Sequence, residues 1–197
     1  MPPSNQNRRY SNIESGQNHA CGIRSDLDQY PGMMDCWSMK KTTKQRSFYR
    51  SLWPHPNIAL QSIVVGVDLT CGLDQDGMAF YWGSPSPQFN ITAPPPYKFQ
   101  SVVSGGNHVC RIVKTTSEVK CWGGNFMNQG SPQEETRFIA LAGGSKHSCG
   151  IRQDNHCLEC WGSFNQSSIP KDVEFLGIAS TNIMTCGIRE DNLIMDC

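Results

Sequence analysis

The sequence lacks a charge imbalance, because its 197 residues contain 17 Lys and Arg and 17 Asp and Glu. No global positive field therefore indicates binding to nucleic acid or to an anionic membrane surface. Long hydrophobic runs are also missing: a stretch such as SIVVGV at 62–67 is far shorter than the roughly 20 apolar residues of a membrane-spanning helix. The N-terminal MPPSNQNRRYSN has no apolar core and is not a signal peptide.

Sequence motifs of common enzyme classes are absent as well. No GxxxxGK[ST] or GxGxxG phosphate-binding loop occurs, and no Ser–His–Asp or paired-carboxylate arrangement stands out. The SGG at 104–106 and the AGG at 142–144 are interpreted as turns. We therefore predict no catalytic, cofactor-binding or metal-binding residues and no cofactor.

Cysteine, in contrast, is abundant, with ten residues. This number indicates either disulfides formed in an oxidising compartment or several metal sites. The stretch HSCGIRQDNHCLECWG at 147–162 taken alone resembles a zinc site, because Cys157 and Cys160 form a CxxC close to two histidines.

The chain contains an internal repeat that decides between these interpretations. Five segments align on one cysteine: SGQNHACGIRSD, VGVDLTCGLDQD, SGGNHVCRIVKT, AGGSKHSCGIRQD and ASTNIMTCGIRED. The aligned residues are Cys21, Cys71, Cys110, Cys149 and Cys186, at successive differences of 50, 39, 39 and 37. The period is thus close to 39, with an insertion in the first unit divided between 27–34 and 40–50.

Each unit has the pattern of short strands separated by Gly, Asn, Asp and Pro, and no window has a convincing helical face. Three or four strands per unit predict an all-β fold, a β-propeller of about five blades. We place the units at 11–57, 58–97, 98–136, 137–173 and 174–197, after a polar tail or blade remnant at 1–10. The inter-blade layers are filled by in-phase aromatic residues: Phe99, Phe138, Phe175, Trp37, Trp82, Trp122 and Trp161.

A second cysteine follows the first by 11 residues in three units and by 15 in the first unit. Paired positions on two adjacent strands fit a disulfide, so we predict Cys21–Cys36, Cys110–Cys121, Cys149–Cys160 and Cys186–Cys197. The second unit has Tyr81 at the partner position, which leaves Cys71 and Cys157 without in-phase partners. Zinc is disfavoured, because Cys160 is a repeat position and Cys157 would face the other side of its strand.

His147 also occupies a repeat position, two residues before the aligned cysteine. His19 and His108 share it, whereas Leu69 and Met184 replace it in the other units. We interpret a site that accepts His, Leu and Met as a packing position whose imidazole bonds a nearby main-chain group.

Two sequons, at Asn90 and Asn165, fall in polar inter-blade loops and are candidate glycosylation sites. Together with the paired cysteines they favour an extracellular location.

The repeated unit sGgxHxCgirxd…xCWGxN resembles the repeats of the regulator-of-chromosome-condensation superfamily of β-propellers. It is most similar to the cysteine-bearing variant in ectodomains of plant crinkly-type receptor-like kinases, over about 11–197. The resemblance implies a ring of seven blades, of which the five units are an incomplete part, so we expect the chain to be a fragment. It also implies that a longer parent carries a membrane span and a serine/threonine kinase domain. Tyr81 departs from the pattern and puts one disulfide in doubt.

The resemblance predicts a non-catalytic ligand-recognition propeller at the extracellular face of the plasma membrane, or a secreted one. Its partner would be a peptide or protein ligand, with a co-receptor as a further candidate, and the segment itself would contact neither nucleic acid nor membrane. The loops Lys40–Arg50, Ser84–Tyr97 and Gly124–Glu135 are the candidate binding elements. Two alternatives stay open: an intracellular scaffold or exchange factor with reduced cysteines, and a secreted propeller-type enzyme inhibitor.

Overall fold

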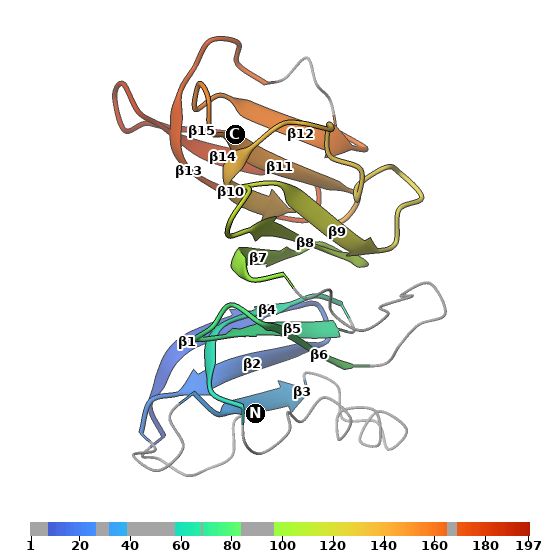
Figure 1. The fold of residues 1–197 in the computed structure, drawn as a ribbon, viewed down its shortest axis with the longest axis vertical. Coiled ribbons are helices and arrows are strands. Elements are labelled where there is room, and N and C mark those ends of the chain that lie inside the picture. Colours follow the sequence, from blue (N-terminus) through green and yellow to red (C-terminus); the bar gives the residue numbers. More distant parts are fainter. Residues whose placement is uncertain (1–7, 27–31, 39–57, 68, 84–96, 165–168) are drawn as a thin grey trace.

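The protein is described here by a computed structural model that covers residues 8–26, 32–38, 58–67, 69–83, 97–164 and 169–197. These residues form an all-β structure of five three-stranded sheets, one for each repeat (Figure 1). No helix within the described residues is long and apolar enough to cross a membrane.

The strands follow one another in chain order. They are β1 (Tyr10–Ser15), β2 (His19–Arg24), β3 (Met34–Ser38), β4 (Leu60–Val65), β5 (Leu69–Asp74), β6 (Ala79–Gly83), β7 (Phe99–Ser104), β8 (His108–Val113), β9 (Val119–Gly123), β10 (Phe138–Gly143), β11 (His147–Arg152), β12 (Leu158–Gly162), β13 (Phe175–Ser180), β14 (Thr185–Arg189) and β15 (Met195–Asp196).

Every sheet is an antiparallel meander with its middle strand paired on both sides. The register is the same in each sheet: the first strand carries a bulge after its first residue, as between Phe138 and Ala140. Tyr10, assigned from the sequence to the polar tail, is the first residue of β1. The inserted segments 27–34 and 40–50 of the first unit lie outside the described residues except for 32–34.

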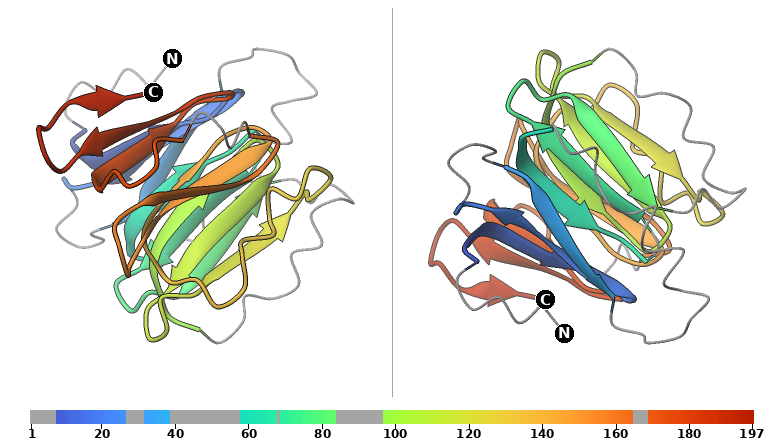
Figure 2. Two further views of the ribbon diagram at one scale, coloured as in Figure 1. Left: turned by 90° about the horizontal axis from the view of Figure 1, so that it is seen from above. Right: turned by 90° about the horizontal axis from the view of Figure 1, so that it is seen from below.

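Successive sheets pack face to face in chain order and form a partial ring (Figure 2). The core consists of layers between sheets, as expected for blades that are too thin to bury both faces alone. In one layer Phe138 and Trp161 of the fourth unit pack on Cys110, Ile112 and Val119 of the third. The unit-to-unit layers are therefore the core of the molecule.

Candidate functional site

The turns after the first strand of all five sheets meet at one hollow of about 370 Å³. The hollow lies at the centre of the partial ring, because β1, β4, β7, β10 and β13 each end beside it. Its walls are formed by Glu14–Gln17, Val65–Val67, Ser104–Gly106, Gly143–Ser145 and Ser180–Asn182. We call this hollow the channel mouth.

Main-chain hydrogen bonds connect neighbouring turns around the channel mouth. The N–H of Val67 donates to the carbonyl of Gly106 (3.4 Å), and the N–H of Gly106 donates to the carbonyl of Gly144 (3.2 Å). The N–H of Ser145 continues the series to the carbonyl of Asn182 (2.9 Å). The second, third and fourth units thus each donate to the next unit, and these bonds hold the last four turns at fixed positions around the opening.

The wall of the channel mouth is mainly polar, with hydroxyl, amide and main-chain groups. Glu14 is the one charged residue among those that line it. Desolvation by the surrounding protein raises the pKa of the Glu14 carboxyl above its ordinary value. The opening therefore offers a single negative charge within a neutral hydrogen-bonding wall.

Histidines below this rim connect successive units through side-chain hydroxyls. His19 Nε2 lies 2.7 Å from Thr70 Oγ1, His108 Nε2 lies 2.7 Å from Ser148 Oγ, and His147 Nε2 lies 2.9 Å from Thr185 Oγ1. The expectation of a main-chain partner for His147 was thus wrong: the partner is a hydroxyl of the next sheet, which a single unit does not reveal.

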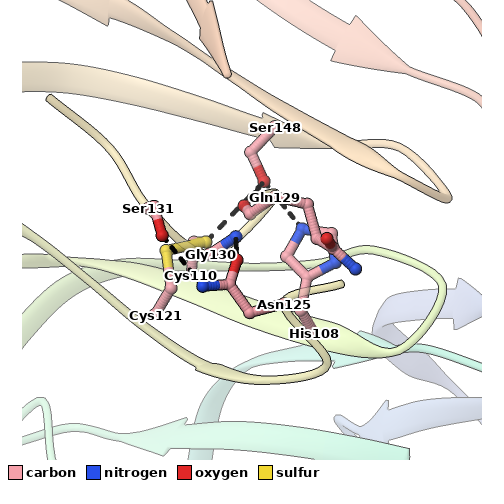
Figure 3. Close-up of a disulfide and its surroundings, with 8 residues drawn as sticks. All are labelled: His108, Cys110, Cys121, Asn125, Gln129, Gly130, Ser131 and Ser148. Carbon is pink, nitrogen blue, oxygen red and sulfur yellow. Dashed lines mark hydrogen bonds between the residues drawn. A yellow bond between two sulfur atoms is a disulfide. The ribbon is translucent and has the colours of Figure 1, made fainter. Parts of the chain in front are cut away.

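The protonation of His108 follows from this geometry. Ser148 Oγ donates its proton to the carbonyl of Gln129 (3.0 Å), so His108 Nε2 must donate to Ser148 (Figure 3). The other ring nitrogen, Nδ1, is buried without a hydrogen-bond partner. A second proton would have no acceptor there, and desolvation, assisted by nearby His147, lowers the pKa of His108 to about 4.

Four disulfides connect the second strand of a sheet to its third strand or to the residue that follows it: Cys21–Cys36, Cys110–Cys121, Cys149–Cys160 and Cys186–Cys197. The first three join directly opposed strand residues, whereas Cys197 directly follows β15. Cys149 and Cys160 are consumed by their mutual bond, which removes two of the thiolates that a zinc site in this stretch would need. Cys71 and Cys157 are free, the first buried and the second partly exposed.

Comparisons with known proteins agree with this arrangement. No protein-family model matches the chain. The serine/threonine-protein kinase-like protein CCR4 of Arabidopsis thaliana is 26% identical over 196 residues, which span 83% of this chain and 24% of that protein. The ectodomain of the receptor kinase CR4 from Physcomitrella patens is 27% identical with a TM-score of 0.80, over 99% of this chain and 52% of that one.

The CRINKLY WD40 ectodomain of the Arabidopsis thaliana receptor kinase ACR4 is 29% identical, with a TM-score of 0.73 over 96% of this chain and 62% of that one. This chain is a crinkly-ectodomain-like region. At 14% identity and a TM-score of 0.68, yeast Prp20, an RCC1 protein, shares the fold alone. The ectodomain likeness and the four disulfides indicate an extracellular location.

The crinkly-like chain departs from its own repeat where the second unit has Tyr81 instead of a cysteine. In the neighbouring unit, Arg111 stands where all the others have glycine. Its guanidinium lies 4.4 Å from the ring centre of Tyr81 and 4.8 Å from those of Phe99 and Trp122, and it donates to Cys71 Sγ at 3.1 Å.

Arg111 is fully buried in this cluster, and no carboxylate in the described part of the chain pairs with it. Burial lowers the pKa of Arg111 and raises the pKa of the Cys71 thiol, and each group opposes the shift of the other. The cation and the three rings occupy the layer between the second and third sheets. Arg111 is therefore a structural residue, although its type alone would point to ligand binding.

Of the three loops predicted to bind, only Gly124–Glu135 is fully described; Lys40–Arg50 and most of Ser84–Tyr97 lie outside the described residues, as do the sequons Asn90 and Asn165. The loop begins beside the channel mouth, because the N–H of Gly124 donates to the carbonyl of Asn107 (2.6 Å). Asn125 braces it internally through Gly130 and Ser131 (Figure 3). Its tip exposes 79% of Phe126.

The sequence did not identify the channel mouth as a site. Its wall is formed by short turns, which the repeat pattern explains as connections between strands. Only the assembled ring shows that these turns converge on one hollow. A signal was present in the first unit, where Glu14 stands in phase with Val64, Val103, Ala142 and Ala179.

Proposed function

We propose that this chain is the ligand-recognition part of a receptor-like kinase and that it binds a peptide or protein ligand at the channel mouth. The observation that carries the proposal is the convergence of five turns on one polar hollow beside an ordered loop. The chain spans only 24% of CCR4 and 52% of the CR4 ectodomain, so kinase activity would belong to other parts of a longer protein.

The chemistry of the opening indicates the class of ligand. Glu14 supplies one carboxylate in a neutral wall, which favours a ligand that places a cationic side chain or an amine into the hollow. Phe126, held on a hydrogen-bonded loop near the rim, supplies an exposed aromatic contact of the kind that dominates binding energy at interfaces. We therefore expect a peptide that carries both a basic residue and an apolar residue.

The test is a random peptide library displayed on phage and selected on the immobilised chain, followed by measurement of the enriched peptides by calorimetry. We expect enrichment of Lys- or Arg-containing sequences. Glu14→Gln should weaken their binding by about tenfold, and Phe126→Ala by a similar factor.

Glu174→Gln is the matched control, because Glu174 is an exposed carboxylate outside the channel wall. It should leave binding unchanged. Enriched peptides without basic residues, or equal binding to the Glu14 and Glu174 variants, would refute recognition by the channel mouth.

The intracellular alternative requires reduced cysteines, which the four paired cysteines disfavour. We also propose, on the likeness to CR4 and ACR4, that the longer protein displays this region at the outer face of the plasma membrane. Localisation of a tagged full-length protein by protease protection on intact cells tests this statement.

A further inference from the structure

The third strand of the third sheet has a free outer edge. β9 pairs with β8 on one side, and no described strand lies on its other side (Figure 1). Cys110 and Cys121 are 4.1 Å apart between Cα atoms, the short separation of a non-hydrogen-bonded antiparallel pair. Because the pairing alternates along a strand, Val119 and Cys121 direct their N–H and C=O groups away from β8, whereas Lys120 directs its own toward Arg111.

The connection to the next unit passes this edge without pairing with it. Residues 132–137 lead to β10, and the N–H of Phe138 donates to the carbonyl of Ser117 (3.0 Å), just before β9. No main-chain hydrogen bond joins 132–137 to Val119 within the described part of the chain. A hollow of about 350 Å³ lies between them, with 118–120 on one side and 132–137 on the other. The main chain of Val119 therefore faces an open hollow.

The charge on the walls of this hollow favours a basic occupant. Glu118 is already paired, because its carboxylate lies 3.6 Å from Lys120 Nζ and 3.3 Å from Arg137 Nη2. Glu134 and Glu135 also line the hollow, are exposed, and take part in no ion pair among the described residues. The walls thus combine free main-chain groups with two carboxylates that no described lysine or arginine neutralises.

A second copy of the chain fits this edge poorly. In a two-fold antiparallel pairing of two β9 strands through Val119 and Cys121, Lys120 would stand directly opposite the same residue of the other copy. Like charges at directly opposed positions destabilise a sheet, and a charged side chain on an edge strand hinders pairing between identical edges. The edge is therefore better matched to a different polypeptide.

We propose that the outer edge of β9 is a docking site for an extended segment of a partner protein that carries basic residues at alternate positions. The partner residue opposite Val119 would exchange two main-chain hydrogen bonds with it, as in other cases of strand addition. Its side chain would lie on the same face of the sheet as that of Val119, which packs toward the fourth unit. The connection that carries Glu134 and Glu135 leads to that unit, so a basic side chain would meet these carboxylates there. The site shares no wall residue with the channel mouth, and either proposal can fail without the other.

The probe is acetyl-Thr-Lys-Val-Lys-Thr-amide, in which both lysines lie on one face of the extended peptide. It is titrated into the isotope-labelled Glu14→Gln chain, so that its lysines do not report on the channel mouth. We expect saturable amide shifts in β9 and at 133–136, and hydrogen exchange at the Val119 amide about tenfold or more slower in the saturated complex. Exchange at the Lys120 amide, which already bonds β8, should change much less. Absence of saturation at millimolar peptide, or unchanged exchange at Val119, would overturn the proposal.

N-methylation of the peptide tests the main-chain bonds separately from the charges. Methyl groups on the amide nitrogens of both lysines remove the donors that would face β9, whereas a methyl group on the central valine removes a donor that would face away. The first change should weaken binding by about tenfold or more, and the second by much less. Equal losses would contradict strand addition.

A double variant and a charge-reversed peptide test the charge match. Glu134→Gln combined with Glu135→Gln should weaken binding by about threefold to tenfold, because exposed carboxylates are screened by solvent. Glu174→Gln is the matched control, since Glu174 is an exposed carboxylate outside this hollow, and should leave binding unchanged. Equal affinity for acetyl-Thr-Glu-Val-Glu-Thr-amide would overturn the proposal. Protection of Val119 that rises with chain concentration alone would also overturn it, because it would assign the edge to a second copy.

Discussion

Arg111 shows how one residue compensates for a change in the neighbouring unit. Tyr81 replaces the cysteine that would bond Cys71, and Arg111 replaces the glycine that its own unit would use, so that one long side chain fills the layer. The guanidinium contacts a sulfur and aromatic rings, and its Nε and Nη1 are buried without a hydrogen-bond partner. Removal of Arg111 therefore opens a cavity and at the same time relieves the cost of an unpaired buried charge.

We expect Arg111→Gly to destabilise the protein by about 3 kcal/mol, because it opens a cavity among three aromatic rings. Urea unfolding measures this change. The double variant Arg111→Gly with Tyr81→Cys restores the repeat and places a cysteine opposite Cys71. The double variant should form a fifth disulfide and recover about 2–3 kcal/mol of the free energy of unfolding. Alkylation of Cys71 in the unfolded double variant without reductant would contradict this account.

His108 gives the protein an acid-sensitive contact between sheets. Its pKa is about 4 in the folded protein and near 6.5 when unfolded. The unfolded chain therefore binds more protons between these values, so stability present above pH 6.5 is lost as the pH falls toward 4, by about 3 kcal/mol in total. Unfolding curves at pH 7.5 and pH 4.5 measure the loss.

The chain contains its own control for this prediction. In the second unit Leu69 replaces the histidine, and Val109 of the third unit replaces the hydroxyl that would bond it. His108→Leu combined with Ser148→Val copies this apolar pair and should stay within about 1 kcal/mol of the parent at pH 7.5. The variant should also lose the part of the acid dependence that His108 supplies, while His147, whose pKa is likewise lowered by desolvation, keeps its own part. An unchanged pH profile would assign the whole dependence to other groups.

These residue-level contacts mark the limit of what the sequence predicts. Packing could be expected at positions 19, 108 and 147 because Leu and Met substitute there. The hydroxyl partners could not, since they lie 38 to 51 residues away on the next sheet. One feature of the sequence did indicate the pairing: Leu69 replaces the histidine, and Val109 replaces the hydroxyl residue in the next unit. This coupled change is found only when each histidine position is compared with the position one residue later in the following unit.

At the scale of elements, the period gives the three strands of each unit and their pairing. Cysteines 11 residues apart on a hairpin can be opposed in only a few registers, and the structure joins the expected residues, as in Cys110–Cys121. The bulge at each first strand and the main-chain bonds between turns could not be predicted in this way, because they depend on the twist and spacing of assembled sheets.

The aromatic layer between sheets should dominate the stability of each element. Phe138→Ala is expected to cost roughly 3–5 kcal/mol, since Phe138 is fully buried against Trp161. Ile139→Ala is the matched control: it changes the adjacent residue of the same strand, whose side chain is 37% exposed, and should cost less than about 1 kcal/mol. Similar losses in the two variants would contradict a core located between sheets.

At the scale of the molecule, five sheets form a partial ring around one polar opening. This geometry explains why the loops predicted to bind are not the residues that line the channel mouth. Sequence composition identifies long polar segments, whereas the channel mouth is lined by the short turns between the first and second strands. The likeness to crinkly ectodomains covers nearly the whole chain and supports the same arrangement.

The most direct test of the account is the state of the ten cysteines in protein exported from cells and purified without reductant. Alkylation in denaturant followed by mass spectrometry should modify only Cys71 and Cys157 and recover four cross-linked peptide pairs. In the native protein only Cys157 should react, because Cys71 is buried. Ten alkylated cysteines without reductant, or cross-links between different units, would contradict an extracellular propeller whose sheets each carry their own disulfide.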